Sequence, residues 1–269
     1  MKSNLSKELD RLKEIRDDNH WDSVRNPSGF SRAKIQTPTG ERVIWIPRDD
    51  DHNKDLQSSR SVGLGGVETL EDLEKSYKAG MELTHTDTLR AEEIDEIIHT
   101  LNKFGPSQGL QKFVPRKMCE IGFRYPRLMN FYEKRYDIPV IGYDISTLAV
   151  EFGLSKNFDV RECDLNNLDS NPLNLEDANI ICFYHVLEHV RNPIQTLMEI
   201  KKSMRGNGLI HIEVPIELDN PQVEYGHLFG FHPGDLIQYC QFVGLNPISV
   251  VTKNIAGAIV IERVGCLSQ

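Results

Sequence analysis

The sequence predicts an α/β protein whose larger, C-terminal part is a mostly parallel sheet flanked by helices. Beyond about residue 115, short apolar or β-branched runs alternate with segments of helical periodicity, which is the rhythm of βα units. Upstream the pattern is patchy, and glycine, proline and serine interrupt it between residues 105 and 109. We therefore expect an N-terminal extension, residues 1–114, followed by a core domain, residues 115–269.

Seven strands and several helices are expected in the core. The last two strands are expected to pair antiparallel through a short turn at Lys253 and Asn254. Asn192 and Pro193 are typical of a helix start and Gly206 of its end. The apolar stripe of this helix is Ile194, Leu197, Met198 and Met204, and a second helix is expected over 233–244. The expected strands are 117–121, 139–143, 159–163, 179–184, 209–214, 247–252 and 256–262.

The extension carries fewer signals. Helical periodicity is visible over 5–15 and over 67–104, and a strand-like run covers 42–47. Residues 49–66 have the composition of a loop. The acidic stretch 68–96 is interpreted as the solvated face of amphipathic helices, although it could also be an interaction surface.

Composition and charge exclude several classes of protein. Hydrophobic residues make up 39% of the 269 and charged residues 26%, which is typical of a packed globular chain. A net charge of −9 disfavours non-specific nucleic-acid binding and favours a small-molecule partner. Apolar runs such as 255–261 are far shorter than the roughly 20 residues that span a bilayer. With no apolar signal region at the N-terminus, we expect a cytoplasmic protein without membrane insertion.

The cysteines do not suggest a metal knuckle or a disulfide framework. They are five in number and widely spaced, and three lie in strand-like runs. We expect buried, reduced thiols.

Polar residues follow the expected strands at the edge where an α/β sheet binds its ligand. Glu120 and Gly122 end the first strand, and Asp144 ends the second, where it is placed to accept the hydroxyls of a ribose. Asp164 ends the third strand, beside the expected adenine edge. His185 directly follows the fourth strand.

These motifs resemble those of the class I S-adenosylmethionine (SAM)-dependent methyltransferases. The matching features are an acid before a glycine loop, an acid ending strand two, and Asp-Leu after strand three. The stretch HVLEHVRNP, 185–193, and the segment GHLFGFHPGDLIQYCQFVGL, 226–245, are similar to the branch that contains ubiquinone, sugar and natural-product O-methyltransferases. The resemblance covers about residues 115–263, and residues 1–114 resemble no family that we can name.

The resemblance implies a Rossmann-like, seven-stranded methyltransferase core with SAM as cofactor. It implies an enzyme that methylates an oxygen, less favourably a nitrogen, of a polar small molecule such as a sugar or a nucleotide-linked or phosphorylated metabolite. The extension would then cover or shape the acceptor site, and a homodimer is compatible with this family. The cofactor-binding residues that it implies are Glu120, Gly122, Arg124, Asp144, Ile145, Asp164, Leu165 and Tyr184.

One departure from the family lies in the first loop. The family has G-x-G-x-G, whereas this chain has Gly122, Phe123, Arg124, Tyr125 and Pro126. Arg124 could pair with the methionyl carboxylate of SAM or point to solvent. The missing glycines also leave open an alternative, a non-catalytic SAM-binding module.

Histidines are the candidates for removing the acceptor proton. His185 after the fourth strand and His227 after the fifth flank the expected position of the transferred methyl group, and either is suited to be the general base. His211 lies within a strand and is expected to be structural.

The same stretch raises the question of a metal. Its H-x-x-E-H pattern matches a zinc-peptidase motif, which the flanking motifs disfavour. Certain relatives carry E-x-x-E-H here and hold a divalent ion. Glu188 and His189, with a contribution from His227, would suit such an ion, and packing or capping roles are the alternative.

Overall fold

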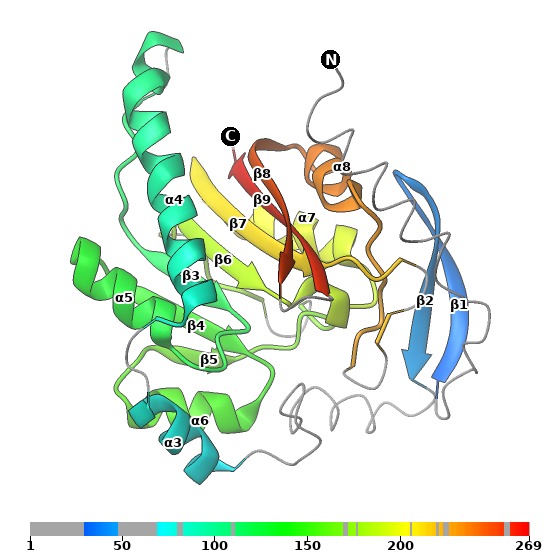
Figure 1. Ribbon diagram of the computed structural model, residues 1–269, viewed down its shortest axis with the longest axis horizontal. Helices are drawn as coiled ribbons and strands as arrows, with labels where there is room; N and C mark the ends of the chain where they lie inside the picture. Colours follow the sequence, from blue (N-terminus) through cyan, green and yellow to red (C-terminus); the bar gives the residue numbers. More distant parts are fainter. Residues whose placement is uncertain are drawn as a thin grey trace.

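The structure, a computed structural model, contains a large sheet with helices on both faces and a separate two-stranded hairpin (Figure 1). It describes residues 30–47, 69–79, 83–108, 111–168, 172–175, 177–204, 206–218, 221–222, 226–255 and 259–268. The expected helix over 5–15 and loop over 49–66 lie outside these residues.

The large sheet has seven strands in the order β5-β4-β3-β6-β7-β9-β8. All neighbours from β5 to β7 are parallel, and β9 lies antiparallel between β7 and β8. The chain runs from β3 outward through β4 to β5 and then returns to β6, so the order reverses beside β3. Such a reversal opens a ligand crevice at the carboxyl ends of the strands. The strands are β3 (Met118–Ile121), β4 (Val140–Asp144), β5 (Val160–Glu162), β6 (Ile180–Tyr184), β7 (Gly208–Pro215), β8 (Leu245–Ile255) and β9 (Ile259–Ser268).

Alternation along the strands divides the core into two clusters, one on each face of the sheet. Met118 and Ile180 pack with helices α4, α5 and α6, whereas Cys119 and Ile181 pack with α7 and α8. This three-layer arrangement confirms the Rossmann-like α/β fold expected from the sequence. The helices are α3 (Leu70–Ala79), α4 (His85–Phe104), α5 (Arg127–Tyr136), α6 (Thr147–Ser155), α7 (Pro193–Ser203) and α8 (Asp235–Phe242), with 3-10 turns η2 (Gly105–Gln108) and η3 (Leu187–His189).

Two details of the sequence prediction are wrong. Met198 is 46% exposed and not part of the buried stripe of α7, because the helix turns it away from the sheet. Lys253 and Asn254 do not form a turn, because both lie in β8, and the ladder continues to the pair Ile255 and Ile259. The cap of α7 is as expected, since the Asn192 side chain accepts a hydrogen bond from the Gln195 amide.

The helical stretch expected in the extension is present as α3 and α4. Helix α4 lies across one face of the sheet (Figure 1). Its start is fixed by a capping box between Thr84 and Asp87, and Ile94, Ile97 and Ile98 are buried in the core. Part of the N-terminal extension is therefore built into the main core.

A further described part of the extension is the hairpin of β1 (Phe30–Thr37) and β2 (Gly40–Pro47), of which only the second strand is expected from the sequence. It docks against the segment before α8. The Trp45 amide donates to the Leu228 carbonyl at 2.9 Å, and the Arg42 guanidinium makes two hydrogen bonds of 2.8 and 2.7 Å to Asp235.

All five cysteines are buried free thiols, as expected. Burial raises the pKa of Cys163 and of Cys182 to about 12. Among the described residues, no helix is both long enough and apolar enough to cross a membrane.

Candidate functional site

Asp144 joins the loops that follow β3 and β4. Its side chain is 9% exposed, and its two oxygens accept hydrogen bonds of 2.9 Å from the backbone amides of Arg124 and Ser146. Burial raises the pKa of Asp144, and these amides oppose that rise. Each carboxylate oxygen can accept a further hydrogen bond, so the residue can organise the loops and still bind a hydroxyl pair.

The loop after β3 lacks two of the family's glycines, and two of its residues, Gly122 and Arg124, have positive φ. Gly122 has φ +71°, and a Cβ there would lie 2.5 Å from Val186 Cγ2. Arg124 has φ +39°, which is strained for a residue with a side chain. Its guanidinium lies 5.3 Å from the centre of the Tyr125 ring. The departure from G-x-G-x-G is thus accommodated by a strained residue at position 124.

Glu120 ends β3 as a buried carboxylate with one oxygen lacking a hydrogen-bond partner in the described structure. Burial raises its pKa well above the ordinary value, as does the nearby charge of Asp87, whereas the backbone amide of Met129 lowers it. That amide belongs to α5, so Glu120 connects the end of β3 to the helix that follows it. A buried oxygen without a partner fits an ammonium group such as the methionyl amine of SAM.

The remaining donor-side residues lie at the same sheet edge. Asp164 follows β5 and accepts a 2.9 Å hydrogen bond from the Asn166 amide. Ile145 and Leu165 are half-buried, one residue beyond Asp144 and Asp164. The buried Tyr184, at the end of β6, has its hydroxyl 2.9 Å from His211 Nδ1. The expected cofactor residues thus follow four adjacent strands, which fits a nucleoside-containing ligand.

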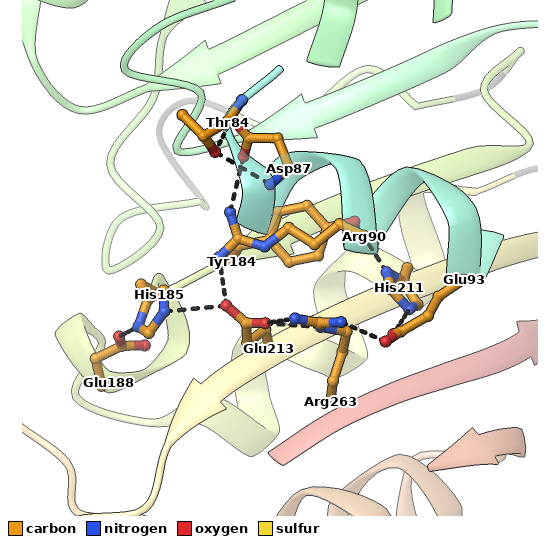
Figure 2. A network of polar contacts seen from close by, with 10 residues as sticks. All are labelled: Thr84, Asp87, Arg90, Glu93, Tyr184, His185, Glu188, His211, Glu213 and Arg263. Carbon is orange, nitrogen blue, oxygen red and sulfur yellow. Dashed lines mark hydrogen bonds and ion pairs between the residues drawn. The ribbon is translucent and has the colours of Figure 1, made fainter. Parts of the chain in front are cut away.

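His185 lies between two buried carboxylates (Figure 2). Its Nδ1 is 3.2 Å from Glu188 Oε1 and its Nε2 is 3.0 Å from Glu213 Oε1. Burial would lower the pKa of His185, but the two carboxylates raise it to about 9. The two carboxylates thus favour the protonated form of His185, which is the form that cannot accept a further proton.

His227 and His189 form a second group beside Glu188. Both oxygens of Glu217 lie 2.9 Å from His227 Nδ1 and raise the pKa of this histidine, against the opposing effect of burial. His189 Nδ1 lies 3.0 Å from the Gly226 carbonyl, and burial lowers the pKa of His189 to about 4. The two rings meet edge to face at 4.8 Å.

The residues expected to suit a metal are brought together. One potential ligand atom from each of Glu188, His189 and His227 lies within 4.8 Å of the other two. Carbonyl and carboxylate contacts to the opposite ring nitrogens are the usual way of orienting histidine ligands. The group therefore has the composition and spacing of a divalent-cation site.

Sequence reasoning missed Glu213, Glu217 and Arg90. Glu213 had a visible signal, since it is a charged residue in the apolar run of β7. Arg90 gave no such signal, because its partner Glu213 is 123 positions away in the chain. Glu217 gave none either, because it and His227 lie in an irregular segment.

Comparisons with known proteins identify a family for this chain. A family model described as a methyltransferase domain matches residues 89–250, starting inside α4. No curated protein sequence matches the chain. A structure provisionally described as a sarcosine dimethylglycine methyltransferase from Galdieria sulphuraria has a TM-score of 0.52 and 12% identity, over 68% of this chain and 85% of that chain.

Two further solved structures are similar at lower scores. A SAM-dependent methyltransferase from Aquifex aeolicus has a TM-score of 0.46 and 15% identity, over 66% of this chain and 98% of that chain. Magnesium protoporphyrin IX methyltransferase from Synechocystis, with bound SAH, has a TM-score of 0.47 and 10% identity, over 74% and 94%.

The family model covers more than half of the chain, and the Galdieria structure supports the fold. The chain belongs to the methyltransferase domain family, as a class I SAM-dependent methyltransferase.

Proposed function

We propose that the enzyme transfers the methyl group of SAM to an oxygen, in preference to a nitrogen, of a polar small molecule. A sugar or a nucleotide-linked or phosphorylated metabolite is the acceptor class that we favour. The observation that carries this proposal is the Glu217–His227 pair beside the end of β6, because removing a hydroxyl proton requires a base at the transfer site.

The donor site is proposed from the strand-end residues. Asp144 would bind the ribose hydroxyls, Asp164 the adenine edge, and the unpartnered oxygen of Glu120 the methionyl ammonium. Arg124 would face the methionyl carboxylate. Bound SAM supplies an already activated methyl group, so the protein mainly positions the acceptor and accepts its proton. The residues that would complete the donor pocket are Gly122, Ile145, Leu165 and Tyr184.

His227 is the proposed general base. Glu217 accepts the Nδ1 proton of His227, which fixes the tautomer whose Nε2 can take a proton. His185, charged and held by two carboxylates, is assigned an orienting role instead.

The hairpin of the extension supports the acceptor side through a series of main-chain hydrogen bonds. Trp45 donates to the Leu228 carbonyl, and the Leu228 and Phe229 amides donate to the Glu188 carbonyl at 2.6 and 3.0 Å. His227 lies next to this anchored segment. We therefore propose that the extension, residues 1–114, shapes the acceptor site.

A divalent cation at Glu188, His189 and His227 is the second candidate for activating the acceptor, supported by their 4.8 Å spacing. A cation at these residues would lower the pKa of an acceptor hydroxyl.

Product analysis tests the proposal. Purified protein with SAM and fractions of a metabolite extract is expected to release S-adenosylhomocysteine (SAH) and a methylated oxygen product. His227→Gln should lower turnover at least a hundredfold with SAH affinity within threefold of wild type. The matched control is His99→Gln, an exposed position on α4, which should leave both unchanged.

Three results would contradict it. Release of no SAH with any fraction would indicate a binding module. Loss of wild-type activity on chelation, restored by a divalent ion, would assign activation to a cation. A methylated nitrogen or carbon would reject oxygen as the acceptor.

A further inference from the structure

A buried network of charges connects helix α4 to His185 (Figure 2). Its centre is Glu213, which is fully buried near the end of β7. One Glu213 oxygen contacts Arg90 of α4 and lies 3.0 Å from His185 Nε2. The other accepts hydrogen bonds from Arg263 of β9, including one of 2.6 Å from Nε. Three cationic side chains thus share one carboxylate.

The network has a second half, which does not reach His185. Arg263 Nη1 lies 2.6 Å from Glu93 Oε1, and Glu93 also contacts Lys253 at 3.2 Å and His211 at 3.6 Å. Glu93 and Glu213 therefore have similar surroundings. Each carboxylate forms an ion pair with Arg263 and contacts at least one other basic residue and one histidine. Only Glu213 touches a residue of the proposed transfer site.

Glu213 holds His185 by both main chain and side chain. The His185 amide donates to the Glu213 carbonyl at 3.0 Å, in addition to the contact between their side chains. His185 has φ +55°, a conformation that a residue with a side chain adopts only when its surroundings impose it. These contacts fix where the ring lies at the end of β6.

Arg90 ties the same carboxylate to the donor side. Its guanidinium lies 4.2 Å from the centre of the Tyr184 ring and also pairs with Asp87 in the first turn of α4. Tyr184 directly precedes His185, so Arg90 contacts the end of β6 and the carboxylate that holds the next residue.

We propose that Glu213 is a positioning residue of the methyl-transfer site, which together with Arg90 fixes His185 beside the donor. Helix α4 is then a working part of the site and not only a cover on the sheet. This inference rests on the proposed function for its kinetic test, but not for its spectroscopic test. Its physical basis is that small displacements of positioning groups cost large factors in rate.

The test compares two isosteric variants, Glu213→Gln and Glu93→Gln. Each leaves Arg263 with one carboxylate fewer, so both are expected to lower the melting temperature. Only Glu213→Gln is expected to lower kcat at least tenfold with the KM for SAM within threefold, whereas Glu93→Gln should keep both within threefold. Arg90→Lys retains the charge but not the two separate nitrogens that contact Glu213 and Asp87, and should lower kcat by an intermediate factor.

Nuclear magnetic resonance of protein labelled with 15N-histidine and saturated with SAH supplies a readout that needs no acceptor. The ring signals of His185, assigned with a His185→Gln variant, are expected to move in Glu213→Gln and in Arg90→Lys but not in Glu93→Gln. If Glu213→Gln does not fold, Arg90→Lys gives the same comparison.

Equal losses of kcat in the Glu213 and Glu93 variants would overturn the inference, because they would indicate a purely structural network. Unmoved His185 signals in both Glu213→Gln and Arg90→Lys would overturn it as well. If wild type turns over no acceptor while the His185 signals behave as expected, the proposed function fails and the positioning role stands.

Discussion

Asp144 offers the sharpest test of the donor site, because one carboxylate is assigned two separable tasks. In the structure it accepts hydrogen bonds from the backbone amides of Arg124 and Ser146. We propose that it also binds the ribose hydroxyls. Asp144→Ala removes both sets of hydrogen bonds. Asp144→Asn keeps the shape and one carbonyl acceptor, but turns an amide NH2 toward a backbone donor.

The magnitude follows from counting charge-assisted hydrogen bonds. At roughly 1.5 kcal/mol each, two bonds to the ribose correspond to about 3 kcal/mol, or on the order of a hundredfold in affinity. The two backbone amides correspond to a similar loss of about 3 kcal/mol in the free energy of unfolding. We expect Asp144→Ala to show both losses, and Asp144→Asn to show about half of each.

Calorimetry with SAH and urea denaturation measure the two quantities separately. The control is Asp159→Asn, an exposed residue just before β5, which should change neither. If a folded Asp144→Ala protein binds SAH within threefold of wild type, the assignment of Asp144 to the ribose is wrong.

Three further predictions concern the loop, the hairpin and the buried network. Gly122→Ala should lower thermal stability and SAH affinity, because the added Cβ would clash with Val186. Gly206→Ala is the control: Gly206 also has a positive φ, +81°, but has open space around it, so this variant measures the loss of stability caused by φ without a clash. Arg42→Met should lower the free energy of unfolding by about 3 to 5 kcal/mol in urea denaturation, because Asp235 is left buried and unpaired, and adding Asp235→Asn should restore part of it. Burial would raise the pKa of Glu93, but His211 and Arg263 lower it from 4.5 to about 2. Ionised Glu93 therefore stabilises the folded protein fully above pH 4.5, and this contribution is lost as the pH falls toward 2. The stability difference between wild type and Glu93→Gln should therefore shrink by about 3 kcal/mol over that range, and an unchanged difference would contradict the assignment.

The core strands could be predicted because most of them are short apolar or β-branched runs, and polar residues follow several of them directly. Asp144 is an example, since its place depends only on where β4 ends. Strand β1 could not be predicted, because its FSRAKIQT sequence has few apolar residues and alternates between exposed and half-buried positions.

The state of His185 could not be predicted either. Its position after β6 was visible, but its charge depends on Glu213, which comes from another strand. The contact between Arg90 and Glu213 spans 123 positions of the chain, and nothing local signals such a pairing. Local patterns thus predict which residues end the strands, whereas the protonation of His185 depends on partners that are distant in the chain.

Because all five cysteines are buried, their reaction with a thiol reagent can report local unfolding of the native protein. A thiol reacts with a disulfide reagent only as a thiolate in contact with solvent, so each cysteine is silent until its part of the sheet opens. Cys163 follows β5, at one edge of the sheet, beside Asp164 of the proposed nucleoside site. Cys240 of α8 contacts Cys266 of β9, near the other edge of the sheet. The order in which the thiols are consumed therefore ranks the regions by local stability, without any label added to the chain.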